Sequence, residues 1–316
     1  MKHTATVATW CLMVGLSGFW TSILTAASRT QAPQGGVERV YKTVENTDLK
    51  LYLYGLDSKR SLPPKPAIVF FFGGGWRGGT PRQFENHCRY FASRGMVAIT
   101  AEYRVSTRHK VKAVECVRDA KSAVRWIRQH AEELNVAPHK IVAAGGSAGG
   151  HLAACTSVID ALDDPSEDIT ISSKPNALVL FNPAVMLAPE EGILALSPSK
   201  LASLETRTGI APKNLSPYHH VRMATPPTII FHGQDDTTVP FSTVKAFQSR
   251  QVLYGGRSIL VPFPGKGHGF FNHGRFNNEP FRQTLKASDA FLKSLGFLEG
   301  ADTVDRFLAP EAGRAN

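Results

Sequence analysis

A glycine-rich turn that carries a serine constrains the fold of this chain more than any other feature. The apolar segment 140–144 is typical of a buried strand, 148–162 is typical of a helix, and the sequence GGSAG at 145–149 joins them. Such a turn is so sharp that only small residues fit beside the serine, and it aims the hydroxyl at the positive end of the helix. The pattern therefore predicts a reactive serine, Ser147, between a strand and a helix.

Strands and helices alternate along most of the chain, which predicts an α/β fold with a mostly parallel central sheet and helices on both faces. Strands are expected at 37–44, 49–54, 66–72, 96–103, 140–144, 177–182, 228–232 and 258–263, and helices at 81–93, 111–134, 148–162, 242–254 and 279–295. The proline-rich segment 183–227 interrupts this rhythm, with a short helix expected from Ser197 to Gly209. Long insertions of this kind are usually lids or binding loops, and a surface excursion is the alternative.

Two further kinds of polar residue follow predicted strands. His268 lies between glycines after 258–263, and Asp235 and Asp236 follow 228–232. Open α/β sheets bind ligands at the carboxyl ends of their strands, and a serine hydroxyl needs a base that is itself held by an acid. The chain order serine, aspartate, histidine therefore predicts a catalytic triad of Ser147, one of the two aspartates and His268.

A run of glycines, 73–75, follows the expected strand 66–72 and precedes Trp76. Glycines allow successive backbone N–H groups to turn towards one point, where they would hold the negative charge of a tetrahedral intermediate together with the N–H of Ala148. Trp76 adds a bulky ring beside this loop, and we expect the ring to contact substrate and to shorten an acyl pocket.

These segments together resemble the α/β-hydrolase serine esterases, in the group that spans the hormone-sensitive-lipase-like esterases and the acetyl-xylan or feruloyl esterase-like (BD-FAE-like) branch. The resemblance covers roughly 37–295 and is carried by 72–76, 101–104, 145–151, 232–240 and 267–270. It implies an α/β-hydrolase fold with a small insertion near the site.

The resemblance also implies a role for each matching residue. By position, Ser147 matches the nucleophile, His268 the base and Asp236 the acid, because the family's acid stands four places after the histidine of a His-Gly pair. The oxyanion donors correspond to Gly74, Gly75 and Ala148. Phe72 stands where the family usually has a histidine, so the hydrogen bond of that imidazole is missing from the oxyanion loop.

The N-terminus has the pattern of a secretory signal. Lys2 and His3 precede an uncharged segment, 4–28, that ends in small residues. We expect a signal peptide at 1–27, with an uncleaved membrane anchor as the alternative. A catalytic domain at 28–300 and a flexible C-terminal tail at 301–316 would follow. The protein is then expected to be secreted or periplasmic, without membrane attachment after cleavage.

Charge and composition limit the partners. Lys and Arg number 36 against 26 Asp and Glu, a net charge of +10, but the basic residues are scattered and predict no nucleic-acid partner. No cluster has zinc-type spacing and no glycine-rich phosphate loop carries a lysine, so no metal or cofactor is expected. In the mature chain Cys88, Cys116 and Cys155 allow at most one disulfide, whose pairing stays open.

The sequence as a whole predicts a secreted serine carboxylesterase that hydrolyses short-acyl esters through an acyl-enzyme. The substrate would be a small-molecule or polysaccharide-linked ester, since the resemblance extends to enzymes that remove acetyl or feruloyl groups from polysaccharide. One alternative is a serine peptidase of the prolyl-oligopeptidase kind, which normally carries a propeller that this chain is too short to hold. The other is a non-catalytic hydrolase-fold binding protein, which usually lacks a triad residue.

Overall fold

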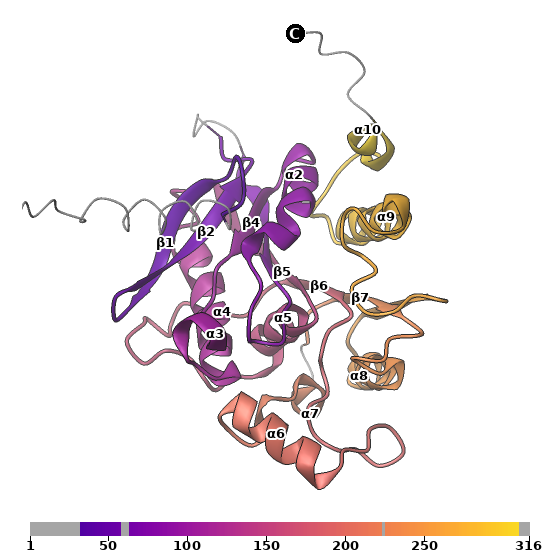
Figure 1. The fold of residues 1–316 in the computed structure, drawn as a ribbon. Helices are drawn as coiled ribbons and strands as arrows, with labels where there is room; N and C mark the ends of the chain where they lie inside the picture. The colour runs from indigo at the N-terminus through magenta and orange to yellow at the C-terminus, as the bar shows by residue number, and fades with distance from the viewer. Residues whose placement is uncertain (1–31, 58–62, 223–224, 310–316) are drawn as a thin grey trace, which may run out of the picture. The chain divides into compact units, whose positions relative to one another are not determined.

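The computed structural model describes residues 32–57, 63–222 and 225–309 (Figure 1). Contacts divide the chain into two units, Met1–Ala32 and Pro33–Asn316, and the fold below is that of the second unit. The expected signal peptide at 1–27 lies outside the described residues. Among those residues, no helix combines the length and the apolar character that crossing a membrane requires.

An eight-stranded sheet forms the centre of this unit, in the order β1-β2-β4-β3-β5-β6-β7-β8 (Figure 1). The strands are β1 (Val37–Val44), β2 (Thr47–Tyr54), β3 (Lys65–Phe71), β4 (Val97–Ala101), β5 (Val136–Gly146), β6 (Ala177–Phe181), β7 (Thr228–Gly233) and β8 (Ser258–Phe263). Strand β2 pairs antiparallel with β1 and β4, and all other neighbours are parallel. The predicted mostly parallel α/β sheet is confirmed.

Helices connect the strands and cover the sheet. The α-helices are α2 (Glu85–Ser93), α3 (Ser106–His109), α4 (Ala113–Gln129), α5 (Ala148–Val158), α6 (Pro198–Thr208), α7 (Pro217–His220), α8 (Phe241–Leu253), α9 (Glu279–Ser294) and α10 (Val304–Leu308). In the described part of the chain, short 3₁₀ turns also lie at Pro81–Phe84, Pro212–Leu215 and Phe276–Asn278. The helix expected at 81–93 therefore begins as a 3₁₀ turn, and the one expected at 111–134 is shorter than its apolar pattern.

Alternate side chains of β3 point to opposite faces of the sheet, as the strand geometry requires. Val69 and Phe71 belong to one large core with the apolar residues of α4, α5 and α8. On the other face, the ring of Phe70 lies 4.9 Å from that of Phe84 and 6.1 Å from that of Phe91 on α2. Helices thus cover both faces, and the central strands β3, β4, β6 and β7 are buried between them, whereas the edge strands β1 and β8 are partly exposed.

The described part of the expected tail is packed, so the expectation of flexibility is wrong for 301–309. Val304 of α10 is fully buried, and the ring of Phe307 lies 5.5 Å from that of Tyr90. Asp305 also forms an ion pair of 2.6 Å with Lys286 on α9. Two apolar residues three positions apart are enough to dock one helical turn, although they are too few to show as a periodic pattern. Residues 310–316 lie outside the described part.

The three cysteines of the second unit are buried and unpaired. Cys88, Cys116 and Cys155 are each free, and burial raises the pKa of each thiol above its ordinary value. They fill apolar space as small side chains, and the disulfide that their number allowed is not formed.

Candidate active site

Ser147 occupies a strained turn between β5 and α5. Its backbone has φ +54° and ψ −118°, a conformation that L-residues rarely adopt. A Cβ added to Gly149 would lie 2.0 Å from the carbonyl oxygen of Phe71, and one added to Gly145 would lie 2.5 Å from the backbone of Gly149. Glycine at these positions lets α5 begin directly against the end of β3, and the turn lifts the hydroxyl out of the sheet.

The structure brings Ser147, His268 and Asp236 together, although they lie on three separate loops. The Nε2 atom of His268 is 2.9 Å from the Oγ atom of Ser147, and its Nδ1 atom is 2.7 Å from Oδ2 of Asp236. Because a carboxylate oxygen can only accept, the neutral ring carries its proton on Nδ1 and offers Nε2 as the acceptor for the serine hydroxyl. This relay has the geometry that proton removal from Ser147 requires.

The two adjacent aspartates lie in different environments. Asp236 is buried, and its Oδ1 accepts hydrogen bonds of 2.9 Å from the N–H groups of Thr238 and Val239. Burial raises the pKa of this carboxyl, but the hydrogen bonds from His268 and from the two N–H groups outweigh it and hold the pKa below its ordinary value. Asp235 is exposed. Only Asp236 therefore faces His268 as a desolvated carboxylate.

Two residues to which the sequence analysis gave no role hold this arrangement. Asn182, directly after β6, accepts a 3.0 Å hydrogen bond on Oδ1 from the N–H of Gly269, which follows His268. His232, at the end of β7, is buried and donates from Nε2 to the carbonyl of Val239 at 2.9 Å. The position of each polar residue at the carboxyl end of a strand was the signal that could have found them.

The glycine-rich loop after β3 leaves backbone donors without an internal acceptor. Gly74 and Gly75 have φ of +123° and +62°, and among the described residues their N–H groups donate no hydrogen bond. Ala148 is the first residue of α5, where an N–H has no intrahelical partner. The N–H of Gly73 is different, because it donates to Oε1 of Gln83 at 2.6 Å. The N–H groups of all three predicted oxyanion donors are therefore available to a ligand.

Phe72, at the position of the missing histidine, is held by Tyr103. The two rings stack with centroids 4.1 Å apart, and the hydroxyl of Tyr103 donates to the carbonyl of Phe72 at 2.7 Å. Further along the loop, the N–H of Ser106 donates to the carbonyl of Trp76 at 3.0 Å. Stacking and backbone hydrogen bonds thus fix the loop without an imidazole.

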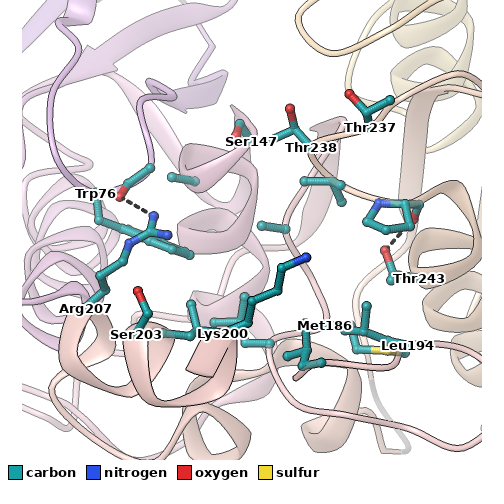
Figure 2. A pocket seen from close by; sticks show the side chains of 18 of the residues that line it. Trp76, Ser147, Met186, Leu194, Lys200, Ser203, Arg207, Thr237, Thr238 and Thr243 are labelled. Carbon is teal, nitrogen blue, oxygen red and sulfur yellow. Dashed lines mark hydrogen bonds between the residues drawn. The ribbon is translucent and has the colours of Figure 1, made fainter. Parts of the chain in front are cut away.

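A cavity of about 570 Å³ opens beside Ser147 (Figure 2). The proline-rich insertion 183–227 supplies many of the residues that line this cavity. The insertion is therefore part of the site and is not a remote surface excursion. Its larger apolar contributors are Met186, Leu187, Leu194, Leu196 and Leu204. Within the segment, α6 begins after Ser197, whose side chain accepts the N–H of Lys200, and ends at Gly209, as predicted.

Trp76 lines this cavity, and its ring is held by a hydrogen bond to a buried histidine. Its Nε1 donates to Nδ1 of His151 at 3.2 Å, and Nε2 of His151 bonds the carbonyl of Leu215 at 2.6 Å. Burial lowers the pKa of His151 to about 4, which keeps the imidazole neutral and able to accept from the indole. The indole is therefore a rigid wall beside the oxyanion loop. Among the described residues, no three metal-ligating side chains gather at one point.

Comparison with known proteins identifies relatives of this architecture. Residues 52–250 match the model of the BD-FAE family. A probable isoprenylcysteine alpha-carbonyl methylesterase from Arabidopsis thaliana is 26% identical over 72% of this chain and 50% of its own length. Esterase LipC from Mycobacterium tuberculosis is 25% identical over 67% of this chain and 55% of its own length. The chain thus spans about half the length of these curated relatives.

Solved structures match more of the chain. Thermogutta terrifontis esterase 2 phosphonylated by sarin is 52% identical, with a TM-score of 0.81, and the match covers 85% of this chain and 98% of that one. The butyrate-bound structure of the same esterase is 53% identical, with a TM-score of 0.80, over 84% and 97% of the two chains. Together with the family match over more than half of its length, these likenesses show that this chain has the α/β-hydrolase fold of known esterases and belongs to the BD-FAE family.

Proposed function

We propose that this protein is a serine carboxylesterase in which Ser147 is the nucleophile, His268 the general base and Asp236 the acid that orients it. The observation that carries the proposal is the pair of short contacts on His268, 2.9 Å to Ser147 and 2.7 Å to Asp236, beside the cavity. The similar esterase that sarin phosphonylates supports it, because an activated hydroxyl nucleophile attacks the phosphorus of such a reagent and displaces its leaving group.

The first half of the reaction forms an acyl-enzyme. Nε2 of His268 takes the proton of Ser147 while Oγ attacks the acyl carbon, and the carbonyl oxygen becomes an oxyanion. The N–H groups of Gly74, Gly75 and Ala148 stabilise that charge. His268 then returns the proton to the leaving alcohol, the ester C–O bond breaks, and the acyl group remains on Oγ.

The second half repeats these steps with water. His268 takes a proton from water, hydroxide attacks the acyl carbon, and the same backbone donors hold the second oxyanion. Collapse releases the carboxylic acid and returns the proton to Ser147. Because the Asp236 carboxylate stays ionised, it stabilises the imidazolium that forms twice in each cycle.

The expected acyl group is short. The similar Thermogutta terrifontis esterase 2 has been solved with propionate and with butyrate bound. In this chain Trp76 and the leucines of the insertion line the cavity beside Ser147. Each methylene gains about 0.8 kcal/mol only where a groove buries it, so chains longer than the cavity gain nothing further.

We also propose that the enzyme is exported, because the segment 1–27 has the pattern of a secretory signal. In that location, acetyl or feruloyl esters on polysaccharide are a proposed natural substrate. Export is tested by expressing the full chain and determining the N-terminal residue of the protein from the periplasm or the medium. Cleavage after Ala27 supports export, whereas a retained N-terminus on membrane-bound protein contradicts it.

The activity is tested with p-nitrophenyl acetate and butyrate, acetylated and feruloylated sugars, and a peptide anilide as the amide counterpart. The proposal predicts turnover of esters, little turnover of the anilide, and loss of ester turnover in Ser147→Ala by several orders of magnitude with an unchanged Tm. Preference for the anilide would favour a peptidase. Ester turnover that survives in Ser147→Ala would contradict the proposal.

A further inference from the structure

A second cavity, of about 430 Å³, adjoins the one beside Ser147. The two cavities share Gly75, Trp76 and Arg207, so the indole and the guanidinium form a partition between them. The second cavity lies against the loop after β3, the junction of α3 and α4, and α6. Any part of an ester bound at Ser147 that reached beyond Trp76 would enter this second cavity.

The charged side chains that line the two cavities are all basic. Lys200 and Arg207 line the first, and Arg77, Lys110, Lys112 and again Arg207 line the second. Among the described residues, neither lining contains an aspartate or a glutamate, and none of these five cations forms an ion pair there. Three separate segments thus bring positive charge to one place, whereas a solvated helix face would mix both signs.

Arg207 is the central cation of this surface. Its Nη2 donates to the carbonyl of Gly75 at 3.1 Å, and its guanidinium lies 5.4 Å from the centre of the Trp76 ring (Figure 2). Partial desolvation of this otherwise exposed guanidinium lowers its pKa, and the nearby Arg77 lowers it further. A carbonyl oxygen orients a guanidinium but does not neutralise it, so the charge remains available to an anion.

Lys200 carries the positive charge into the first cavity. It lies on α6 one turn before Ser203, and Figure 2 shows its side chain extended into the space below Ser147. Low-dielectric walls around a cleft of one sign focus its field on a bound ligand. A carboxylate at the distal end of a substrate would therefore meet Lys200 or Arg207 without meeting a like charge.

We propose that this site selects esters that carry a negative charge, a carboxylate in the first instance, on the part of the molecule remote from the scissile bond. The inference rests on the proposed esterase function and names its substrate class. The wall formed by Arg77, Lys110, Lys112, Lys200 and Arg207, here called the basic wall, binds that charge, while Ser147 acts on an uncharged acyl carbon.

The experiment compares matched esters that differ in charge. One arm places the charge on the alcohol, with 3-acetoxybenzoate, the neutral 3-acetoxy-N-methylbenzamide and the cationic 3-acetoxyphenyl-trimethylammonium. The other places it on the acyl group, with mono-p-nitrophenyl adipate and the neutral p-nitrophenyl hexanoate. The readout is the ratio of kcat/KM for the charged ester to that for its neutral partner, measured in wild type and in two variants, Lys200→Gln and the double variant Lys110→Gln/Lys112→Gln. Because each ratio is compared between proteins, the intrinsic reactivities of the esters cancel.

In at least one arm, the ratio for the anionic ester should fall about threefold for each lysine removed, mainly through KM, and 0.5 M NaCl should reduce the wild-type preference. Lys293→Gln, on the exposed surface of α9, removes the same charge elsewhere and should leave the ratios unchanged. Ratios that are equal in wild type and both basic-wall variants, in both arms, would overturn the inference. Such a result with rapid hydrolysis of the neutral esters leaves the esterase function standing, whereas no hydrolysis of any ester overturns the esterase function itself.

Discussion

The turn around Ser147 and the wall formed by α6 face the same cavity but are built in opposite ways. At the turn, Gly149 abuts the end of β3, the N–H of Ser147 donates to the carbonyl of Phe181 at 2.9 Å, and Asp236 is buried. On α6, only Thr208 is buried, and Lys200 and Arg207 are exposed. The first region is held by close backbone contacts and hydrogen bonds, and the second presents exposed side chains to the cavity.

This contrast assigns different tasks to the two regions. Chemistry depends on precise distances between a few atoms, so its residues are held by the sheet and by backbone hydrogen bonds. Selection among substrates depends on the shape and charge of a wall, which exposed side chains can supply without supporting the fold. Substitutions at the turn should therefore lower activity or stability, whereas substitutions on α6 should change which esters the enzyme prefers.

The largest difference is expected between the two adjacent aspartates. Asp236→Asn should lower kcat/KM for p-nitrophenyl acetate about a thousandfold or more, because an amide does not hold the tautomer of His268 that accepts the serine proton. Asp235→Asn, an exposed change of identical chemistry, should stay within about twofold of wild type. Equal losses in the two variants, with Tm unchanged, would show that the acid has been misassigned.

A methyl group at Gly149 should destabilise the whole fold. The added Cβ of Gly149→Ala would lie 2.0 Å from the carbonyl oxygen of Phe71, so α5 must move away from β3. We expect the free energy of unfolding in urea to fall by about 3 kcal/mol. Gly78→Ala is the control, since its Cβ would have nothing within 4 Å, and it should change stability by less than about 1 kcal/mol. A Gly149→Ala protein as stable as wild type would refute the close approach.

A buried histidine, His87, should make the stability of the fold depend on pH. His87 is fully buried among the rings of Phe70, Phe84, Phe181, Phe271 and Phe281. Burial, with a smaller contribution from His273, lowers its pKa to about 3. The folded protein therefore keeps this ring neutral, whereas the unfolded chain takes up a proton below the ordinary histidine pKa of about 6.5.

It follows that His87 contributes a loss of stability as the pH falls from about 6.5 towards 3. Between pH 8 and pH 5 this loss amounts to about 2 kcal/mol. The variant His87→Met, which has no proton to bind, should lose correspondingly less stability than wild type over that interval in urea unfolding. His139→Gln, at an exposed position, should follow the wild-type curve. Identical pH dependence in wild type and His87→Met would contradict the neutral buried ring.

The smallest effect on activity should come from changes to the apolar side of the cavity that α6 forms. With p-nitrophenyl esters, kcat/KM should be highest for acetyl to butyryl groups and fall beyond about six carbons, as the cavity is outgrown. Leu204→Ala, on the α6 side of the cavity, should move the optimum towards longer chains by making hexanoyl and octanoyl esters about threefold better relative to acetate. An optimum at decanoyl in wild type, or an activity jump at the substrate's micelle point, would indicate a lipase.

The parts of the molecule that follow local patterns could be predicted from sequence. Strand β3 is a continuous apolar run, and α6 is marked by Ser197 before Pro198 and by Gly209 at its end. Ser147, Asp236 and His268 could be proposed as a triad because each follows a strand, and parallel strands bring their carboxyl ends to one edge of the sheet. Spacing within the family's motif was enough to prefer Asp236 over Asp235.

The parts that depend on contacts between distant segments could not be predicted. Nothing near Arg207 in the sequence shows that it will lie beside Trp76, or that Lys110 and Lys112 will line a cavity with it. The apolar docking of α10 rests on Val304 and Phe307, too few residues for a periodic signal. The support of Phe72 by Tyr103 likewise joins residues thirty-one positions apart, and only the fold brings them together.

In the proposed reaction, Oγ of Ser147, activated by His268, is the atom that the acyl group joins. The most direct test is to treat the protein with a fluorophosphonate ester, record the intact mass and map the modified peptide. We expect one adduct per chain, on Ser147, formed in parallel with the loss of p-nitrophenyl acetate hydrolysis and absent from Ser147→Ala. An adduct on another residue that abolishes hydrolysis, or full hydrolysis by protein that is completely labelled on Ser147, would contradict it.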